Sequence, residues 1–292
     1  MRLSCRPPLD AEGLIAFLAQ RAVDGVEEVE DGVYRRSLRL PAGAGVVELR
    51  PSEECVQARF WLADRRDLSE AVRRSRELLD LDCEPQQVLG VLGADPLLGP
   101  LVREAPGRRV AGQVDPAELA ARAVLGQQVS VRAACALAAR LVGTCGEPLT
   151  RPVGGVTHLF PSAHALARAD PEGLAMPRAR ALALQTLARA LTRGELELDA
   201  RADPSRARRR LLSLPGIGPW TTEYIAMRAL RDADAFPASD LGVRRALQRL
   251  GHRGDPDSAR ELAERWRPYC AYAVVHLWAS LQQCQQARTA PR

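Results

Sequence analysis

The 292-residue chain contains no lysine, and all 41 of its basic residues are arginines. No lysine amine is therefore available to form a Schiff base with a substrate. The sequence also has no apolar run near the ~20 residues that a membrane helix needs, and residues 1–8 lack the apolar stretch of a secretory leader. We therefore expect a cytoplasmic protein that makes no contact with a membrane.

The seven cysteines of the chain are scattered, and none belongs to a Cys-x-x-Cys pair. Their odd number and spacing argue against a disulfide framework or a zinc site. An iron–sulfur cluster needs closely grouped thiolates, whereas the C-terminal region offers only Cys270 and Cys284. We therefore expect no cofactor of these kinds.

Aromatic residues are also few, with four each of Phe, Trp and Tyr. The net charge of +5 and the pI of about 9.0 permit nucleic-acid binding without requiring it. A hydrophobic fraction of 46% and a charged fraction of 26% are typical of a globular protein. The length allows one to three domains, and we expect a monomer.

Residues 1–87 have the pattern of a small α/β domain. Asp10 and Asp67 each precede a run with apolar residues at helical spacing, which predicts two helices. Antiparallel strands are predicted between them, at residues 34–40, 45–50 and 56–62. This region contains no group of catalytic residue types, so the sequence favours a structural or positioning role.

Strand signals end near residue 86, and the rest of the chain is predicted to be helical, with loops rich in Pro, Gly and Asp. The predicted helices span residues 88–92, 117–141, 163–169, 178–193, 206–214, 220–230, 241–250, 259–266 and 271–283. The predicted fold class is therefore α+β, with a small antiparallel sheet and its helices at the N-terminus, followed by an all-helical body.

Residues 214–219, Leu-Pro-Gly-Ile-Gly-Pro, join two of the predicted helices. Glycine lets the backbone approach another surface closely, and Pro219 suits the first position of a helix. The amides of Gly216, Ile217 and Gly218 are therefore predicted to form an anion site that suits a DNA phosphate. An ordinary turn between two helices has the same pattern and commonly contains glycine, so the turn alone favours an ordinary turn.

A longer match around this turn favours DNA. Residues 209–278 resemble the helix-hairpin-helix DNA glycosylase superfamily, in particular the AlkA-type 3-methyladenine DNA glycosylase II. The matching segments are Leu-Pro-Gly-Ile-Gly-Pro-Trp-Thr at 214–221, Tyr-Ile-Ala-Met-Arg at 224–228, Phe-Pro-x-x-Asp at 236–240 and the run from Ala263 to Trp278. Residues 124–130 and 176–181 match as well, and the N-terminal helix with Phe17 and Arg21 resembles the extra domain of the AlkA type.

The resemblance implies a helix-hairpin-helix glycosylase body in two parts. We expect an α/β domain at residues 1–87, a helical domain formed by residues 88–112 with 233–292, and a helical domain at residues 113–232 that contains the hairpin. The implied function is base excision repair, in which alkylated bases such as 3-methyladenine and 7-methylguanine are flipped out of double-stranded DNA and removed, leaving an abasic site.

Asp240 precedes a predicted helix, where an aspartate is commonly an N-cap. The resemblance implies that Asp240 is also the catalytic aspartate. The two roles are compatible, because a helix N-terminus attracts a carboxylate. An ionised carboxylate can stabilise the cationic sugar that forms as the glycosidic bond breaks, or orient the attacking water.

Superfamily members that also cut the DNA backbone carry a catalytic lysine at the position that Trp220 occupies. Because this chain has no lysine, we expect a monofunctional glycosylase without AP lyase activity. The competing hypotheses are a bifunctional glycosylase/lyase, which the missing lysine disfavours, and a non-catalytic DNA-binding hairpin module, which would need neither a special carboxylate nor an aromatic cluster.

The residues that the resemblance places in the base pocket are Trp220, Tyr224, Trp278, Phe17 and Leu241. A purine alkylated at N3 or N7 is cationic, and electron-rich ring faces attract it by about 1–2 kcal/mol. Close relatives carry a tyrosine at the position of Leu241, so we expect a wider pocket and a broader substrate range here. The sequence does not rank the alkylated bases.

The apolar wedge of the family, which fills the space of a flipped base, maps onto Gln128. A glutamine can hydrogen-bond the orphaned partner base, or it can be an ordinary helix-surface residue, and both alternatives stay open. The other implied DNA-binding residues are Leu214, Gly216, Ile217, Gly218, Thr221, Arg132 and Arg244. The hairpin of this superfamily often holds a monovalent cation through backbone carbonyls, which here are those of Leu212, Leu214 and Ile217.

Overall fold

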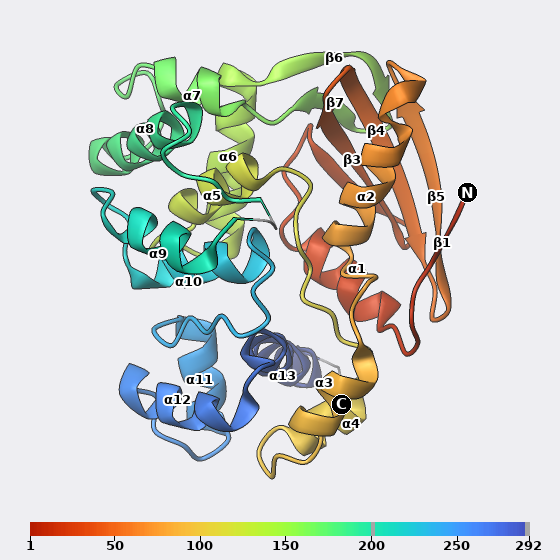
Figure 1. Cartoon of the computed structure of the whole chain (residues 1–292), viewed down its shortest axis with the longest axis vertical. Helices are drawn as coiled ribbons and strands as arrows, with labels where there is room; N and C mark the ends of the chain where they lie inside the picture. Colours follow the sequence, from red (N-terminus) through yellow and green to blue (C-terminus); the bar gives the residue numbers. More distant parts are fainter. Residues whose placement is uncertain (200–201, 290–292) are drawn as a thin grey trace.

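A computed structural model of the chain describes residues 1–199 and 202–289. The N-terminal part is an antiparallel sheet with the strand order β1-β5-β4-β3-β2 (Figure 1). Its strands are β1 (Arg2–Ser4), β2 (Glu27–Glu30), β3 (Val33–Leu40), β4 (Gly43–Pro51) and β5 (Cys55–Leu62). The three strands predicted from alternation are confirmed, whereas β1 and β2 are too short to give a periodic signal.

Two helices pack on this sheet through alternate strand residues. They are α1 (Ala11–Ala19) and α2 (Leu68–Leu78), the latter preceded by a short 3₁₀ turn, η1 (Arg65–Asp67). Asp10 caps α1 by accepting a hydrogen bond from the Gly13 amide, as Asp commonly does at such a position. Leu14, Leu18 and the sheet residues Leu38 and Leu49 are buried together in one core.

The rest of the chain is mainly helical, which confirms the α+β fold class. The helices are α3 (Pro85–Leu92), α4 (Gly99–Glu104), α5 (Pro116–Leu125), α6 (Val131–Cys145), α7 (Ala163–Arg168), α8 (Arg178–Thr192), α9 (Pro204–Leu212), α10 (Pro219–Arg228), α11 (Leu241–Arg249), α12 (Pro256–Ala263), η2 (Glu264–Trp266) and α13 (Cys270–Thr289).

Two predictions for this part are wrong. The helix predicted at residues 117–141 is two helices, α5 and α6, because the chain turns between Gly126 and Ser130 and Gln128 adopts a left-handed φ of 55°. The body is also not purely helical, since β6 (Glu147–Val153) and β7 (Val156–Leu159) form a hairpin. Leu149, Val156 and Leu159 of this hairpin pack with Val46 of the N-terminal sheet.

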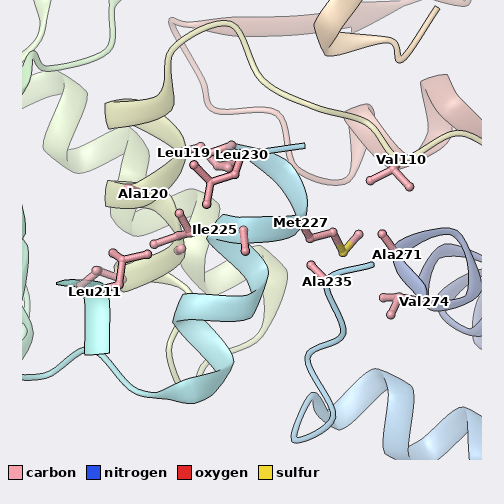
Figure 2. Packing of buried hydrophobic residues seen from close by; sticks show 14 of the residues in the cluster. Val110, Leu119, Ala120, Leu211, Ile225, Met227, Leu230, Ala235, Ala271 and Val274 are labelled. Carbon is pink, nitrogen blue, oxygen red and sulfur yellow. The ribbon is translucent and has the colours of Figure 1, made fainter. Parts of the chain in front are cut away.

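The two predicted helical domains share one continuous hydrophobic core. Figure 2 shows Met227 of α10 directed toward Ala271 and Val274 of α13, while Ile225 of the same helix faces Leu211 and Ala120. Helix α10 therefore packs through apolar side chains on both sides. It joins the other helices of residues 113–232 to the C-terminal helices. Among the described residues, no helix is long and apolar enough to cross a membrane.

Candidate active site

Asp240 lies at the point where the chain enters α11. Its Oδ1 accepts a hydrogen bond from the Val243 amide at 2.9 Å, so the aspartate caps the helix as predicted. This bond satisfies one of the amides that every helix N-terminus leaves unpaired. The positive end of the helix dipole also attracts the carboxylate.

Two indole groups hold the same carboxylate. Nε1 of Trp220, on α10, donates to Asp240 Oδ2 at 2.8 Å, and Nε1 of Trp278, on α13, donates to Oδ1 at 2.9 Å. Each carboxylate oxygen has about two lone-pair sites. Oδ1 therefore has both of its sites filled, whereas Oδ2 keeps one for a ligand.

Gly242 allows Trp278 to come this close. A Cβ atom at this position would lie 2.9 Å from Trp278 Cδ1 and 3.0 Å from Asp240 Oδ1, which is shorter than ordinary contact. The absence of a side chain at Gly242 is therefore part of the geometry that brings the second indole to the carboxylate. Sequence reasoning missed this residue, because a glycine inside a helix gives no signal of what packs against it.

The aromatic residues line up from Asp240 along α10. The rings of Trp220 and Tyr224 stack with centres 5.4 Å apart, as expected for residues four apart on a helix. Trp278 adds a third ring, 6.3 Å from that of Tyr224 and tilted by 42°. The predicted cluster of Trp220, Tyr224 and Trp278 around Asp240 is therefore present.

These groups form one wall of a cleft of about 500 Å³, a size that suits a small ligand such as a nucleobase. Leu241 lies at its mouth and is 55% exposed. The charged residues that also line the cleft are Arg21, Glu27, Arg36, Asp115, Glu118, Arg122, Arg228 and Asp240.

Phe17 is the predicted pocket residue that does not line this cleft. Its ring stacks on Trp278 with centres 6.2 Å apart and borders a separate small cavity. The N-terminal domain contributes Arg21 to the cleft instead, and the Arg21 guanidinium lies 3.8 Å from the centre of the Phe17 ring. Phe17 therefore supports Trp278 and Arg21 from outside the cleft.

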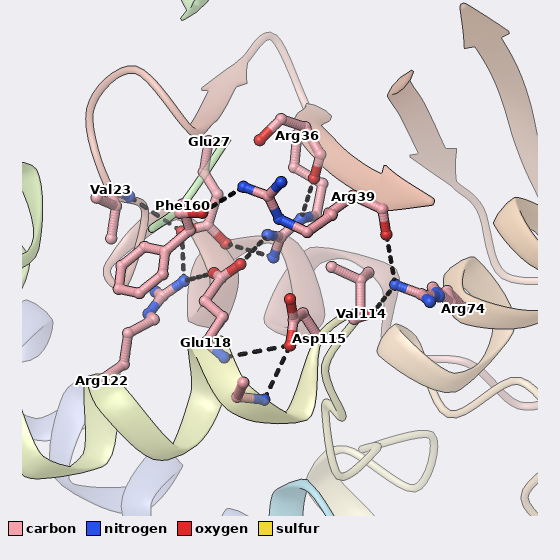
Figure 3. Close-up of polar contacts among 12 residues, drawn as sticks. Val23, Glu27, Arg36, Arg39, Arg74, Val114, Asp115, Glu118, Arg122 and Phe160 are labelled. Carbon is pink, nitrogen blue, oxygen red and sulfur yellow. Dashed lines mark hydrogen bonds and ion pairs between the residues drawn. The ribbon is translucent and has the colours of Figure 1, made fainter. Parts of the chain in front are cut away.

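A buried ion network joins the N-terminal sheet to α5 at the base of the cleft (Figure 3). Arg36 contacts Glu118 at 2.6 Å and Glu27 at 3.3 Å, and Arg122 contacts the same two carboxylates at 2.9 and 2.8 Å. Burial acts to raise the pKa of Glu27, but Arg122 and Arg36 outweigh it and lower the pKa below its usual value. Arg122 also donates to the Arg21 carbonyl, which fixes the backbone beside the cleft.

The helix-hairpin-helix turn lies between α9 and α10. Gly216 has a left-handed φ of 82°, and a Cβ there would lie 2.6 Å from Ala183 Cβ, so the turn itself requires this glycine. A Cβ at Gly218 would meet nothing within 4 Å. The Ile217 amide donates to the Leu214 carbonyl at 3.1 Å. Ile217 is therefore not the free donor that the sequence predicted, and of the three turn amides those of Gly216 and Gly218 have no backbone acceptor among the described residues.

Three of the predicted DNA-binding residues have side chains that are buried and do not face the surface. Leu214, Ile217 and Thr221 are only 4%, 6% and 2% exposed. Thr221 Oγ1 instead accepts a hydrogen bond from Gln127 Nε2 at 2.9 Å, and the same nitrogen lies 2.8 Å from the Gly216 carbonyl. Gln127, which the sequence did not single out, therefore ties the turn after α5 to the hairpin.

The remaining predicted DNA-binding residues lie on or near the surface. Gln128 is exposed at the turn between α5 and α6, and its neighbours Val129 and Ser130 line the cleft. Arg132 is exposed, and no ion pair holds it within the described residues. Arg244 is half-buried, and its Nε donates to the Gly254 carbonyl.

The predicted cation site remains a prediction. Of its three carbonyls, that of Leu214 already accepts the Ile217 amide, whereas no backbone amide of the described residues donates to that of Leu212. No group of three His, Cys, Asp or Glu residues in the described part of the chain could hold a metal ion.

Comparison with known proteins gives two family matches. Residues 1–115 match the AlkA N-terminal domain, and residues 121–269 match the HhH-GPD superfamily base excision DNA repair protein family. A probable bifunctional transcriptional activator/DNA repair enzyme AlkA of Mycobacterium tuberculosis is 49% identical over 97% of this chain, which spans only 57% of that relative. The DNA-3-methyladenine glycosylase 2 of Escherichia coli is 36% identical, over 94% of this chain and 95% of its own length.

A solved structure agrees with these matches. The 3-methyladenine DNA glycosylase from Archaeoglobus fulgidus superposes with a TM-score of 0.84 at 28% identity, over 95% of this chain and 97% of its own. Both the sheet domain and the helical body are therefore covered by one relative.

Proposed function

We propose that this chain, which belongs to the HhH-GPD superfamily of base excision DNA repair proteins, is a DNA glycosylase that removes alkylated bases from double-stranded DNA. The observation that carries the proposal is the Asp240 carboxylate, held by two indoles at an aromatic cleft. The names of the Escherichia coli and Archaeoglobus fulgidus relatives support 3-methyladenine as one substrate, and 7-methylguanine is proposed as another.

The damaged base must leave the duplex before it can enter the cleft, at a cost of a few kcal/mol. The amides of Gly216 and Gly218 and the N-terminus of α10 are proposed to bind a backbone phosphate, which positions the protein without selecting a sequence. Gln128, exposed beside the cleft at the turn before α6, is proposed to enter the space that the flipped base leaves.

Asp240 then acts on the sugar. As the bond from C1′ to the base nitrogen breaks, its electron pair goes to the base, and positive charge develops on the sugar. The free lone pair of Asp240 Oδ2 faces this charge or orients the water that adds to C1′. A base alkylated at N3 or N7 leaves as a neutral molecule, so little general-acid help is needed, and the DNA keeps an abasic site.

We also propose that the enzyme has no AP lyase activity. A lyase needs an amine that attacks C1′ and forms a Schiff base, and the chain contains no lysine. Trp220 has the place of the catalytic lysine of bifunctional superfamily members, and its indole contacts Asp240. We further propose that the chain acts as a cytoplasmic monomer, since one copy supplies the whole cleft, and that the hairpin carbonyls hold a monovalent cation.

Incubation of the protein with methylated duplex DNA, followed by chromatography of the released bases, tests the enzyme function. We expect free 3-methyladenine and 7-methylguanine. Binding without release would instead favour a non-catalytic hairpin module.

Borohydride treatment during the same reaction tests the lyase proposal. We expect no covalent complex between protein and DNA and no strand cleavage before alkali is added. A trapped complex would show that another amine of the protein attacks the sugar.

A further inference from the structure

The Tyr224 hydroxyl is held in the cleft by an arginine one helical turn further along α10. Arg228 Nη1 donates to Tyr224 Oη at 2.8 Å. The other nitrogens of this guanidinium are also engaged, because Nε donates to the Ala111 carbonyl at 2.7 Å and Nη2 to the Gly112 carbonyl at 2.9 Å. Arg228 is only 6% exposed and is therefore a fixed donor.

The direction of this bond determines what the phenol can do. A guanidinium has donors and no acceptor, so the Tyr224 oxygen accepts and its own hydrogen must point elsewhere. Arg21, whose charge also acts on Tyr224, is likewise only a donor. The Tyr224 hydroxyl donates no hydrogen bond to another side chain or backbone oxygen among the described residues, and Tyr224 lines the cleft. The hydrogen is therefore available to a ligand.

The two arginines also strengthen this donor. Burial acts to raise the pKa of Tyr224, but Arg228 and Arg21 outweigh it and hold the pKa below its usual value. A hydroxyl that loses its proton more readily also donates a stronger hydrogen bond.

The same arginines reduce the attraction of the cleft for a cation. The Arg21 guanidinium lies 3.8 Å from the centre of the Phe17 ring and 5.9 Å from that of Trp278, and Arg228 lies 5.6 Å from that of Tyr224. These contacts are of the kind that a cationic base would make, and like charges repel one another. Positive charge alone therefore does not explain how the cleft recognises a base.

Positions along α10 indicate which edge of the base Tyr224 meets. Trp220 contacts Asp240, which marks the sugar end of the cleft. Tyr224 follows one turn later, about 5.4 Å further along the helix axis. A purine with its glycosidic bond at Asp240 would therefore present its far edge, which carries the C6 substituent, to the Tyr224 hydroxyl.

We propose that the Tyr224 hydroxyl donates a hydrogen bond to the carbonyl oxygen of a 6-oxopurine lesion, and that Arg228 positions Tyr224 for this contact. The inference rests on the glycosylase function proposed above and deepens it. A 6-oxopurine such as 7-methylguanine presents an acceptor at this edge. A 6-aminopurine such as 3-methyladenine presents an amino donor at this edge, which offers no acceptor to the phenol hydrogen.

Methylated duplex DNA contains both lesions, so one reaction gives the ratio of their release rates. We expect Tyr224→Phe to lower the ratio of 7-methylguanine to 3-methyladenine release by about 3- to 10-fold, the usual effect of losing one hydrogen bond. Partial unfolding does not change this ratio, because both bases are released by the same folded molecules. Tyr269→Phe is the matched control, since it removes a hydroxyl that bonds Gln87 away from the cleft, and it should leave the ratio unchanged.

Arg228→Leu should lower the ratio by a similar factor, and the double variant should lower it no further, because the two residues act as one unit. If Arg228→Leu does not fold, Tyr224→Phe decides alone. An unchanged ratio in Tyr224→Phe, with both bases still released, would overturn the inference and leave the glycosylase function intact. Absence of release by the unmodified protein would instead overturn the function, and this inference with it.

Discussion

At the scale of single residues, the fixed orientation of the Asp240 carboxylate depends on how closely two indole rings can approach it. Trp220 reaches Oδ2 from the helix that follows the hairpin, and Trp278 reaches Oδ1 only because Gly242 has no side chain. A carboxylate that is fixed before the substrate arrives needs no reorganisation as charge develops on the sugar. The catalytic role proposed for Asp240 therefore extends to residues that never touch DNA.

Gly242→Ala should displace Trp278, because the new Cβ would lie 2.9 Å from Cδ1 of that ring. We expect the single-turnover rate of base release to fall by about tenfold, equivalent to about 1.4 kcal/mol, with little change in DNA affinity. Gly143→Ala is the matched control, since a Cβ at that helical position meets nothing within 4 Å. Equal rates for the two variants would contradict the role of Gly242.

Sequence reasoning at this scale found the residues that motifs and capping rules mark. Asp240, Trp220, Tyr224 and Trp278 could be predicted together, because they fall on one family pattern. The hydrogen-bond partners of Arg228 and Gln127 could not be predicted, because they lie roughly 90 to 120 residues away along the chain. Phe17 was misplaced for the same reason, since only packing decides which side of Trp278 it contacts.

At the scale of elements, the two glycines of the helix-hairpin-helix turn look equivalent in the sequence but have different roles in the structure. Gly216 is required by the turn, which demands a positive φ and leaves no room beside Ala183. Gly218 faces open space and is required by nothing inside the protein. A side chain at Gly218 would therefore disturb only an incoming ligand.

Gly218→Ala should fold with normal stability and bind all DNA sequences about fivefold more weakly at a fixed salt concentration, because a phosphate contact carries no sequence information. Gly216→Ala should instead lower the free energy of unfolding by about 1–3 kcal/mol. Fluorescence anisotropy with two unrelated duplexes and urea unfolding measure these effects. Undiminished binding by Gly218→Ala would argue against a phosphate at this turn.

Helices in which apolar residues recur at a regular spacing could be predicted from the sequence. Elements that depend on a local change in the backbone could not. Helices α9, α11 and α12 are strongly amphipathic and lie close to their predicted bounds. Gln128 interrupts a run that remains helical in pattern on both sides, so the break between α5 and α6 has no periodic signal. The β6–β7 hairpin is short and rich in Pro and Gly, and it depends on the sheet that it covers.

At the scale of the whole molecule, two hydrophobic cores are joined through buried charges. Arg36 and Arg122 balance Glu27 and Glu118 where the sheet meets α5. Breaking a buried ion pair leaves an uncompensated charge and typically costs about 3–5 kcal/mol. The network therefore couples the position of the sheet domain to the wall of the cleft.

Arg122→Leu should lower the free energy of unfolding by about 3–5 kcal/mol, because it leaves both Glu27 and Glu118 short of a partner. Arg73→Leu is the control, since Arg73 pairs with Glu70 and Glu77 on the surface and should cost less than about 1 kcal/mol. Urea unfolding measures both. A loss as small as that of the control would show that the network does not hold the two parts together.

The most direct test of the account is the single-turnover rate of base release from methylated duplex DNA by Asp240→Asn, measured beside its DNA affinity. Asparagine keeps the size of the side chain and removes its charge, and its amide nitrogen cannot accept from an indole as Oδ1 and Oδ2 do. We predict a rate lower by about 10²- to 10⁴-fold with an affinity within a few-fold of the unmodified protein. An undiminished rate would contradict the central role of Asp240.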